Sequence, residues 1–505
     1  MTPHRGMRAL FLATVAWAVA IVWLAPHPPM IDLPQHAGQV ALLSQLLAGH
    51  SPWSHLVQPN LLTPYLGAFA PALPLSYVLP VATVLKILLS VAYLAFVWLG
   101  VALRRRFGAD ARLDWLCVPG FFGYAYEWGF LTFLLAAPIG LGLILTAERY
   151  AEKKSLAQGV AVAMLGVVLL WCHGLTFLFA CGVGVALLWV RAQDWRERLI
   201  SLWPYVVLGA AAIAMFIVLR RTAASFPIPP TVPAVNWHFG LRYEILAYSF
   251  GIRWSRWAAL ASLAFLVAPW LMGLRVDLRR AAAWPAFMVV GIILAFVPHF
   301  VFETTFAYQR FAMFLFPAYA WLFSSSGADH GARAAAWSGR VGVLLLVLAC
   351  WSVQAVNTAK TWRFAEEAAD FDAIAAAVEP GQRALSLVFD RGSDAGASYY
   401  THYAVWYQAE HQGFVDFSFA WYSVLPVRFR PDALPKVNPD MAWHPERFDW
   451  KLHRGADYRY FFVRRKSELP ADFFKGAECP PSMLLARGTW QVFERRDCSS
   501  AGAKR

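Results

Sequence analysis

Residues 84–108 read VLKILLSVAYLAFVWLGVALRRRFG, a run of twenty largely apolar residues followed by three consecutive arginines. A helix needs about 20 predominantly apolar residues to cross the hydrocarbon core of a bilayer. Basic residues just beyond such a helix are typical of its cytoplasmic end. This stretch therefore predicts a membrane-spanning helix that ends in the cytoplasm.

The rest of the chain has the same character. Of its 505 residues, 59% are hydrophobic and only 15% are charged, which is more apolar surface than a soluble domain of this size can bury. The formal net charge is +13, but no Lys/Arg-rich block accounts for it, and the basic residues recur at the ends of apolar stretches. We therefore expect a membrane protein with the lipid bilayer as a partner and no nucleic-acid partner.

Hydropathy predicts eleven spans, several of them short. They lie near residues 8–25, 84–103, 113–126, 129–147, 157–171, 175–190, 199–219, 256–274, 282–298, 311–324 and 341–356. With the N-terminus in the cytoplasm, the inner loops carry seventeen Lys and Arg residues and the outer loops carry six. This asymmetry predicts an N-in, C-out orientation. The apolar stretch 61–80 contains four prolines and is predicted to be an interfacial or re-entrant helix pair instead of a span.

The composition changes from about Asn357, where charges and Gly/Pro turns become frequent. Helical patterns are expected at 363–378 and 399–411, and strands at 383–389, 458–463 and 489–493. The predicted fold class is a polytopic α-helical membrane protein of about eleven spans with a C-terminal soluble α/β or α+β domain. The predicted boundaries are 1–356 for the transmembrane domain, with a large first periplasmic loop at 26–83, and 357–505 for a periplasmic soluble domain.

Asp32 is the only carboxylate between Arg8 and Lys86, in the segment PPMIDLPQH (28–36). One interpretation is an N-cap, since Gln35 three residues later completes a capping-box-like pattern. The other is a general base acting on a polar substrate at the bilayer surface. His36 lies four residues after Asp32 and shares its face if the segment is helical. It is either a polar surface residue or a group that orients the carboxylate or contacts sugar.

Further ionisable residues are expected in the outer turns. Glu127 is a candidate second acid or a solvated loop charge, and His173 ends a predicted span on the same side. The planar fork of Arg310 suits a lipid phosphate, although Arg310 could instead pair with Glu303 or extend to a headgroup. Weaker candidates for the pocket that would hold this lipid phosphate are His299 and Arg242. In the tail, a polar aromatic segment suits either carbohydrate contact or packing, and it contains Tyr400, His402, Tyr407, Glu410 and His411.

Two of the six cysteines, Cys479 and Cys498, lie in the predicted exported tail, where an oxidising compartment permits a disulfide. The other four lie in or beside apolar stretches. No Cys/His cluster has zinc-ligand spacing, so no metal site is expected. Nucleotide-binding and classical hydrolase motifs are also missing from the sequence. No cofactor is expected to be required, and a divalent metal has no support in the sequence.

Taken together, the chain resembles the GT-C class of membrane glycosyltransferases, which use polyprenyl-phosphate-linked sugar donors. The resemblance covers the architecture of most of the chain. In that class a catalytic acid lies in the large loop after the first span, which is where Asp32 lies here. The segments that carry the resemblance are Thr63-Pro64-Tyr65-Leu66, Arg104-Arg105-Arg106-Phe107-Gly108, Gly129-Phe130-Leu131-Thr132-Phe133 and Gln309-Arg310-Phe311.

The resemblance implies transfer of a sugar from a polyprenyl-phosphate donor to a glycan, lipid or protein acceptor at the periplasmic face of the inner membrane. Many members of the class carry two acids in or near the first loops, whereas this loop holds only Asp32. The expected catalytic residues are Asp32, His36 and Glu127. The expected substrate-binding residues are His173, Arg310, Glu303, Arg242 and His299. The alternative is a non-catalytic transporter or assembly factor for envelope polysaccharide that keeps the same architecture.

Overall fold

The computed structural model describes residues 3–224, 235–237, 239–253, 255–301, 304–325 and 332–496. The chain divides into two compact units. Unit 1 consists of the described residues of Met1–Trp23, Leu88–Ile217 and Pro227–Ala359. Unit 2 joins Leu24–Ile87 with the described residues from Lys360 onward and a short segment that begins at Val218. The first loop after the N-terminal helix therefore belongs to the same unit as the C-terminal region.

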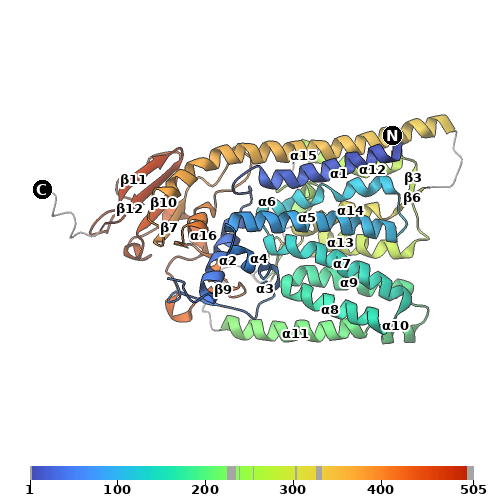
Figure 1. Ribbon diagram of the computed structural model, residues 1–505, viewed down its shortest axis with the longest axis horizontal. Helices are drawn as coiled ribbons and strands as arrows, with labels where there is room; N and C mark the ends of the chain where they lie inside the picture. The colour runs from blue at the N-terminus through green and yellow to red at the C-terminus, as the bar shows by residue number, and fades with distance from the viewer. Residues whose placement is uncertain are drawn as a thin grey trace. The chain divides into compact units, whose positions relative to one another are not determined.

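Unit 1 is built almost entirely of helices, and α7, α8 and α9 pack against one another (Figure 1). Its short strands form the pairs β2–β4, β4–β5 and β3–β6. The helices that contribute to it are α1 (Pro3–Trp23), α5 (Val81–Arg106), α6 (Tyr124–Trp128), α7 (Leu131–Lys153), α8 (Leu156–Cys172), α9 (Gly174–Arg191), α10 (Trp195–Ser201), α11 (Trp203–Ala224), α12 (Arg256–Leu271), α13 (Trp284–Phe296), α14 (Leu315–Ala320) and α15 (Ala332–Ala376). The strands are β2 (Val235–Asn236), β3 (Leu274–Val276), β4 (Phe300–Val301), β5 (Thr304–Thr305) and β6 (Phe323–Ser325).

Six helices in the described part of the chain are long and apolar enough to cross a membrane. They are Arg5–Trp23, Val81–Arg106, Leu131–Lys153, Gly174–Arg191, Trp203–Thr222 and Trp337–Ala376. Shorter apolar helices lie at Leu66–Ser76, Leu156–Cys172, Arg256–Leu271 and Ala281–Phe296. The predicted class, a helical membrane protein with a C-terminal sheet-containing domain, is confirmed. The count of eleven spans and the N-in orientation stay predictions.

Two predicted spans are not continuous helices. Residues 111–128 form two 3-10 helices, η1 (Ala111–Cys117) and η2 (Gly120–Phe122), and then α6. Residues 309–325 form η6 (Gln309–Phe314), α14 and β6. Both segments are largely buried inside the protein, where broken backbone is tolerated because protein groups satisfy its polar atoms. The two segments also approach closely, since a Cβ at Gly120 would lie 2.7 Å from the Met313 carbonyl oxygen.

Unit 2 contains a five-stranded mixed sheet in the order β11-β12-β10-β7-β8 (Figure 1). Its strands are β7 (Arg383–Val388), β8 (Phe414–Asp416), β10 (Tyr460–Arg464), β11 (Ser482–Arg487) and β12 (Trp490–Glu494). β7 pairs in parallel with β8 and β10, whereas β12 pairs antiparallel with β10 and β11. The strands predicted at 383–389, 458–463 and 489–493 correspond to β7, β10 and β12. The segment predicted as helical at 399–411 contains η7 (Tyr403–Val405) and α16 (Trp406–Glu410).

The first loop is attached to the C-terminal region by backbone and side-chain hydrogen bonds. Its elements are α2 (Leu33–Leu47), β1 (Val57–Pro59), α3 (Leu66–Phe69) and α4 (Ala72–Ser76), and β1 pairs antiparallel with β9 (Val427–Phe429). The buried Gln39 amide donates to the Val427 carbonyl and accepts from the Val427 N–H, at 3.1 and 2.8 Å. Gln35 makes the same kind of double contact with Phe417 and Phe419. These bonds fix α2, and with it Asp32, against the segment that follows β8.

Candidate functional site

Asp32 occupies the N-cap position of α2, but its side chain makes no capping hydrogen bond. Its carboxylate oxygen Oδ1 instead lies 3.6 Å from Nε2 of His402 in the C-terminal region. The Asp32 side chain is 15% exposed and the His402 side chain 8%. The N-cap interpretation therefore does not account for the carboxylate, which faces a buried imidazole from a distant part of the sequence.

Two imidazoles are buried near this carboxylate, His402 and His36. Burial lowers the pKa of each ring to about 3, and for His402 the proximity of His36 contributes as well. Both rings are therefore neutral at neutral pH. His36 packs against the rings of Phe69 and Phe419, and its Nδ1 has no hydrogen-bond partner among the described residues. The Asp32 carboxylate therefore lies beside a neutral imidazole and not beside a cation.

These depressed pKa values predict acid sensitivity of the fold. Between about pH 6.5 and pH 3 the unfolded chain binds protons at these positions and the folded chain does not, so stability is complete above pH 6.5 and falls on acidification. The slope is up to about 1.4 kcal/mol per pH unit for each ring. We expect the melting temperature of the detergent-purified protein to fall between pH 7 and pH 4.5, and His36→Leu to reduce that fall.

The exposed His55 provides the matched control for this experiment, because its side chain lies in solvent in the folded protein as it does in the unfolded chain. His55→Asn should leave the pH dependence of the melting temperature unchanged. An identical pH dependence in the wild type and in His36→Leu would show that protonation of His36 does not limit stability.

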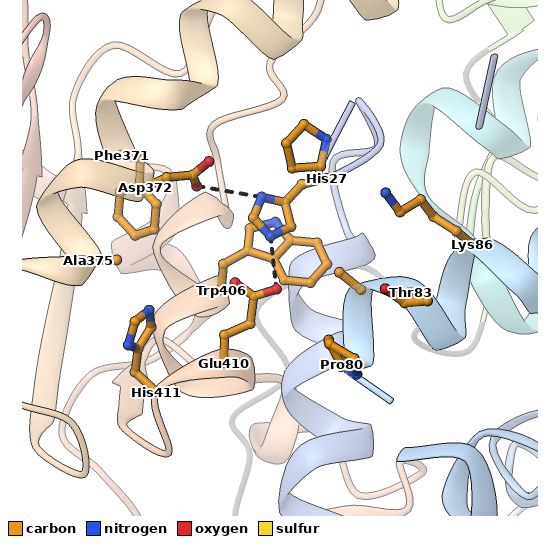
Figure 2. Close-up of a pocket in the computed structure, with 12 residues that line it drawn as sticks. His27, Pro80, Thr83, Lys86, Phe371, Asp372, Ala375, Trp406, Glu410 and His411 are labelled. Carbon is orange, nitrogen blue, oxygen red and sulfur yellow. Dashed lines mark hydrogen bonds and ion pairs between the residues drawn. The ribbon is translucent and has the colours of Figure 1, made fainter. Parts of the chain in front are cut away.

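A second polar cluster in unit 2 surrounds His27 and lines a cavity of about 340 Å³ (Figure 2). We call this cavity the His27 pocket. Its ionisable and aromatic lining residues include His27, Lys86, Asp372, Trp406, Glu410 and His411. They come from the first loop, the start of α5, the end of α15, α16 and the residue that follows α16. The sequence interpretation included Glu410 and His411 in a polar aromatic segment but did not single out His27, Lys86 or Asp372.

His27 lies close to both carboxylates that line the pocket. Its Nε2 lies 3.0 Å from Glu410 Oε1, and its Nδ1 lies 3.6 Å from Asp372 Oδ1. The Tyr403 hydroxyl is 3.1 Å from the same Nδ1, and the imidazole stacks on the Trp406 ring at 4.1 Å. His27 is 6% exposed, whereas Glu410 and Asp372 are 30% and 41% exposed. The buried imidazole thus makes a hydrogen bond to the Glu410 carboxylate and lies close to that of Asp372, and both carboxylates are accessible (Figure 2).

Lys86 supplies a cation to this pocket. Its ammonium donates to the Ala25 carbonyl at 2.9 Å, and the side chain is buried. A charged residue inside an otherwise apolar stretch is a functional signal in membrane proteins, and this signal could have identified Lys86 from the sequence. His27 and Asp372 had no such signal, because each occurs alone in its own segment.

The remaining predicted site residues belong to unit 1. Glu127 is buried, and its Oε2 accepts from the Ile252 backbone N–H at 2.8 Å, so it is not a solvated loop charge. His173 caps α9, with its Nδ1 3.4 Å from the Thr176 amide. The Phe133 ring contacts both His173 and Arg310. The catalytic role of Glu127 and the substrate-binding role of His173 stay predictions.

Arg310 is buried and donates to the carbonyls of Thr305 and Phe306 at 2.7 and 3.1 Å. Its guanidinium carbon lies 3.9 Å from the centre of the Phe130 ring.

Arg242 donates to the Leu294 and Val297 carbonyls at the end of α13, and it lies over the Tyr308 ring. The His299 ring is within hydrogen-bond distance of the Gln309 amide. Glu303 lies outside the described residues. Substrate binding by Arg310, Arg242, His299 and Glu303 stays a prediction.

The other chemical expectations concern metals and cysteines. Within the described ranges, no group of three or more His, Cys, Asp or Glu side chains is arranged to hold a metal ion. Cys117, Cys172, Cys181 and Cys350 are free thiols. Cys479 is disulfide-bonded. Its expected partner Cys498 lies outside the described residues, so this pairing stays a prediction.

No protein-family model matches the chain. No curated protein matches it either. Among solved structures, the chain is similar to ArnT from Cupriavidus metallidurans, solved bound to undecaprenyl phosphate. The similarity has a TM-score of 0.50 and 11% sequence identity, and it covers 97% of this chain and 98% of that one. The resemblance to GT-C membrane glycosyltransferases is therefore confirmed at the level of the fold, which this chain shares with ArnT over nearly its full length.

Proposed function

We propose that the protein transfers a sugar from a polyprenyl-phosphate donor to an acceptor hydroxyl. The observation that carries this proposal is the Asp32 carboxylate, which makes no capping bond to α2 and lies beside the neutral His402 imidazole. The fold shared with ArnT, which was solved bound to undecaprenyl phosphate, supports the class of donor. The distribution of basic residues supports a multi-pass inner-membrane protein with its C-terminal region on the periplasmic side.

In the proposed reaction, an Asp32 oxygen accepts the proton of the acceptor hydroxyl as that oxygen attacks the anomeric carbon of the donor sugar. The bond between this carbon and the phosphate oxygen breaks, and polyprenyl phosphate leaves with the electron pair. A carboxylate suits the first role because its oxygens accept protons. His402 is proposed to position Asp32. His36 is proposed to keep the surroundings of the carboxylate apolar. Neither histidine is required to exchange a proton.

The departing phosphate carries negative charge that the protein must stabilise. Arg310 is the proposed phosphate ligand in unit 1, because a guanidinium can bind two phosphate oxygens at once. Its two carbonyl contacts hold the guanidinium over Phe130. Glu127 is proposed as the second acid, held by the Ile252 amide.

The direct test is release of polyprenyl phosphate. The detergent-purified protein would be incubated with undecaprenyl-phosphate-linked sugars, with an envelope extract as the source of acceptor. We expect release of undecaprenyl phosphate that depends on both the protein and the extract. No release from any donor, together with an envelope-glycan defect in cells that lack the protein, would favour the transporter or assembly-factor alternative.

A further inference from the structure

The ionisable side chains that line the His27 pocket have no part in the proposed roles of Asp32 and Arg310. We propose that the His27 pocket binds one monosaccharide unit of a carbohydrate, with Asp372 and Glu410 as hydrogen-bond acceptors for its hydroxyl groups. The link to a transferred or accepting sugar rests on the proposed function. The binding itself does not, because it follows from the geometry of the pocket.

The size of the cavity fits a small ligand. Its volume of about 340 Å³ is at the lower end of the range of roughly 300–1,000 Å³ that is typical of small-molecule sites. A pocket of this volume suits a single sugar ring better than an oligosaccharide or a lipid chain. It also lies wholly within unit 2, between lining residues of the first loop and the start of α5 (26–86) and lining residues at 371–411.

The accessible groups match the hydroxyls of a sugar. An ionised carboxylate only accepts hydrogen bonds and offers about four lone-pair positions. The bond to His27 occupies one such position on Glu410, and the Asp372 carboxylate lies 3.6 Å from the other ring nitrogen. The hydrogen bond to the buried imidazole therefore orients the Glu410 carboxylate, and both carboxylates remain accessible to a ligand.

The mixture of charges argues against a simple ion site. Lys86 places a cation in the same pocket as the two carboxylates, so neither a bare anion nor a bare cation meets groups of one sign only. Each sugar hydroxyl is both a donor and an acceptor. A polyhydroxylated ligand can therefore donate to Asp372 and Glu410 and accept from Lys86 at the same time. With one lysine against two carboxylates, an acidic sugar should bind less tightly than a neutral one.

The test measures binding without turnover. Saturation-transfer NMR on the detergent-purified full chain would be recorded with glucose, glucosamine and glucuronic acid, in the absence of lipid donor. We expect saturation transfer to glucose or glucosamine and a weaker signal from glucuronic acid. Glu410→Gln and Asp372→Asn should each raise the dissociation constant at least tenfold, because each removes a charged acceptor and keeps the shape of the side chain.

Asp432→Asn is the matched control, because Asp432 lies in the same unit and is 82% exposed. It should leave the dissociation constant unchanged. Melting temperatures of all variants near the wild-type value would show that any loss of binding is local. Absence of saturation transfer to all three sugars, or equal binding by the wild type and the Glu410→Gln, Asp372→Asn double variant, would overturn the proposal.

The transfer assay then separates this inference from the proposed function and identifies the source of the sugar. A raised KM for the lipid-linked donor in Glu410→Gln would assign the pocket to the donor sugar, and a raised requirement for extract would assign it to the acceptor. Sugar binding that maps to the pocket, without transfer from any donor, would leave the inference standing and refute the proposed function. Wild-type transfer by the double variant would support the proposed function and show that the His27 pocket holds neither the transferred nor the accepting sugar.

Discussion

Asp32→Asn is expected to reduce sugar transfer by about 10²–10⁴-fold, the usual contribution of a general base. The substitution keeps the size of the side chain and removes its capacity to accept a proton. Asn is also as good an N-cap residue as Asp, and the native side chain makes no capping bond, so α2 should remain folded. The measurement is the initial rate of undecaprenyl phosphate release at matched protein concentration.

The controls separate proton transfer from packing. Asp432→Asn changes the net charge by the same amount at an exposed position and should retain the wild-type rate. The melting temperature of Asp32→Asn should stay within a few degrees of the wild-type value. A wild-type rate of release from Asp32→Asn would remove this carboxylate from the mechanism and move the base to another acid.

The prediction at Asp32 shows what a local pattern can reveal. A lone carboxylate in a long uncharged stretch stands out in the sequence, and so does His36 one helical turn later. Its partner His402 does not, because the contact joins residues far apart in the chain. The His27 pocket illustrates the same limit, since the bond between His27 and Glu410 spans 383 positions. Hydropathy and periodicity describe single segments, and they carry no information on which segments meet.

The elements of the fold likewise differ in whether a local sequence pattern predicts them. The long apolar helices and the strands β7, β10 and β12 follow from patterns over five or more residues. The strands β8 and β9 have only three residues each, which is too short for a periodicity to be detected. The segments 113–126 and 311–324 are apolar enough to be predicted as spans. They form short helices instead because they pack against other protein segments.

Gly123 lies in one of these broken segments, and Gly123→Ala is expected to be strongly destabilising. A Cβ at this position would lie 2.5 Å from the Tyr248 carbonyl oxygen and 2.7 Å from the carbonyl carbon and oxygen of Ser249. These are backbone atoms, which cannot rotate away as the end of a side chain can. Overpacking of this kind typically costs about 1–3 kcal/mol and sometimes more.

A shift of the backbone caused by Gly123→Ala should also affect Glu127, the proposed second acid. Gly123 is the N-cap of α6, which carries Glu127, and the Glu127 carboxylate accepts from the Ile252 amide three residues beyond Ser249. Moving the two segments apart would therefore weaken this hydrogen bond as well. We expect a melting temperature lowered by several degrees in detergent, with a lower yield of folded protein.

Gly182 provides the matched control, because it lies inside α9. Apart from its two chain neighbours and the backbone of its own helix, no atom of the described residues lies within 4 Å of the position that a Cβ would take there. Ala favours helix over Gly by up to about 1 kcal/mol, so Gly182→Ala should keep or raise the melting temperature. Equal melting temperatures for Gly123→Ala and Gly182→Ala would contradict the close backbone contact at Gly123. A loss confined to Gly123→Ala would support direct packing of the broken segment at 111–128 against Tyr248 and Ser249, the residues that a Cβ at Gly123 would meet.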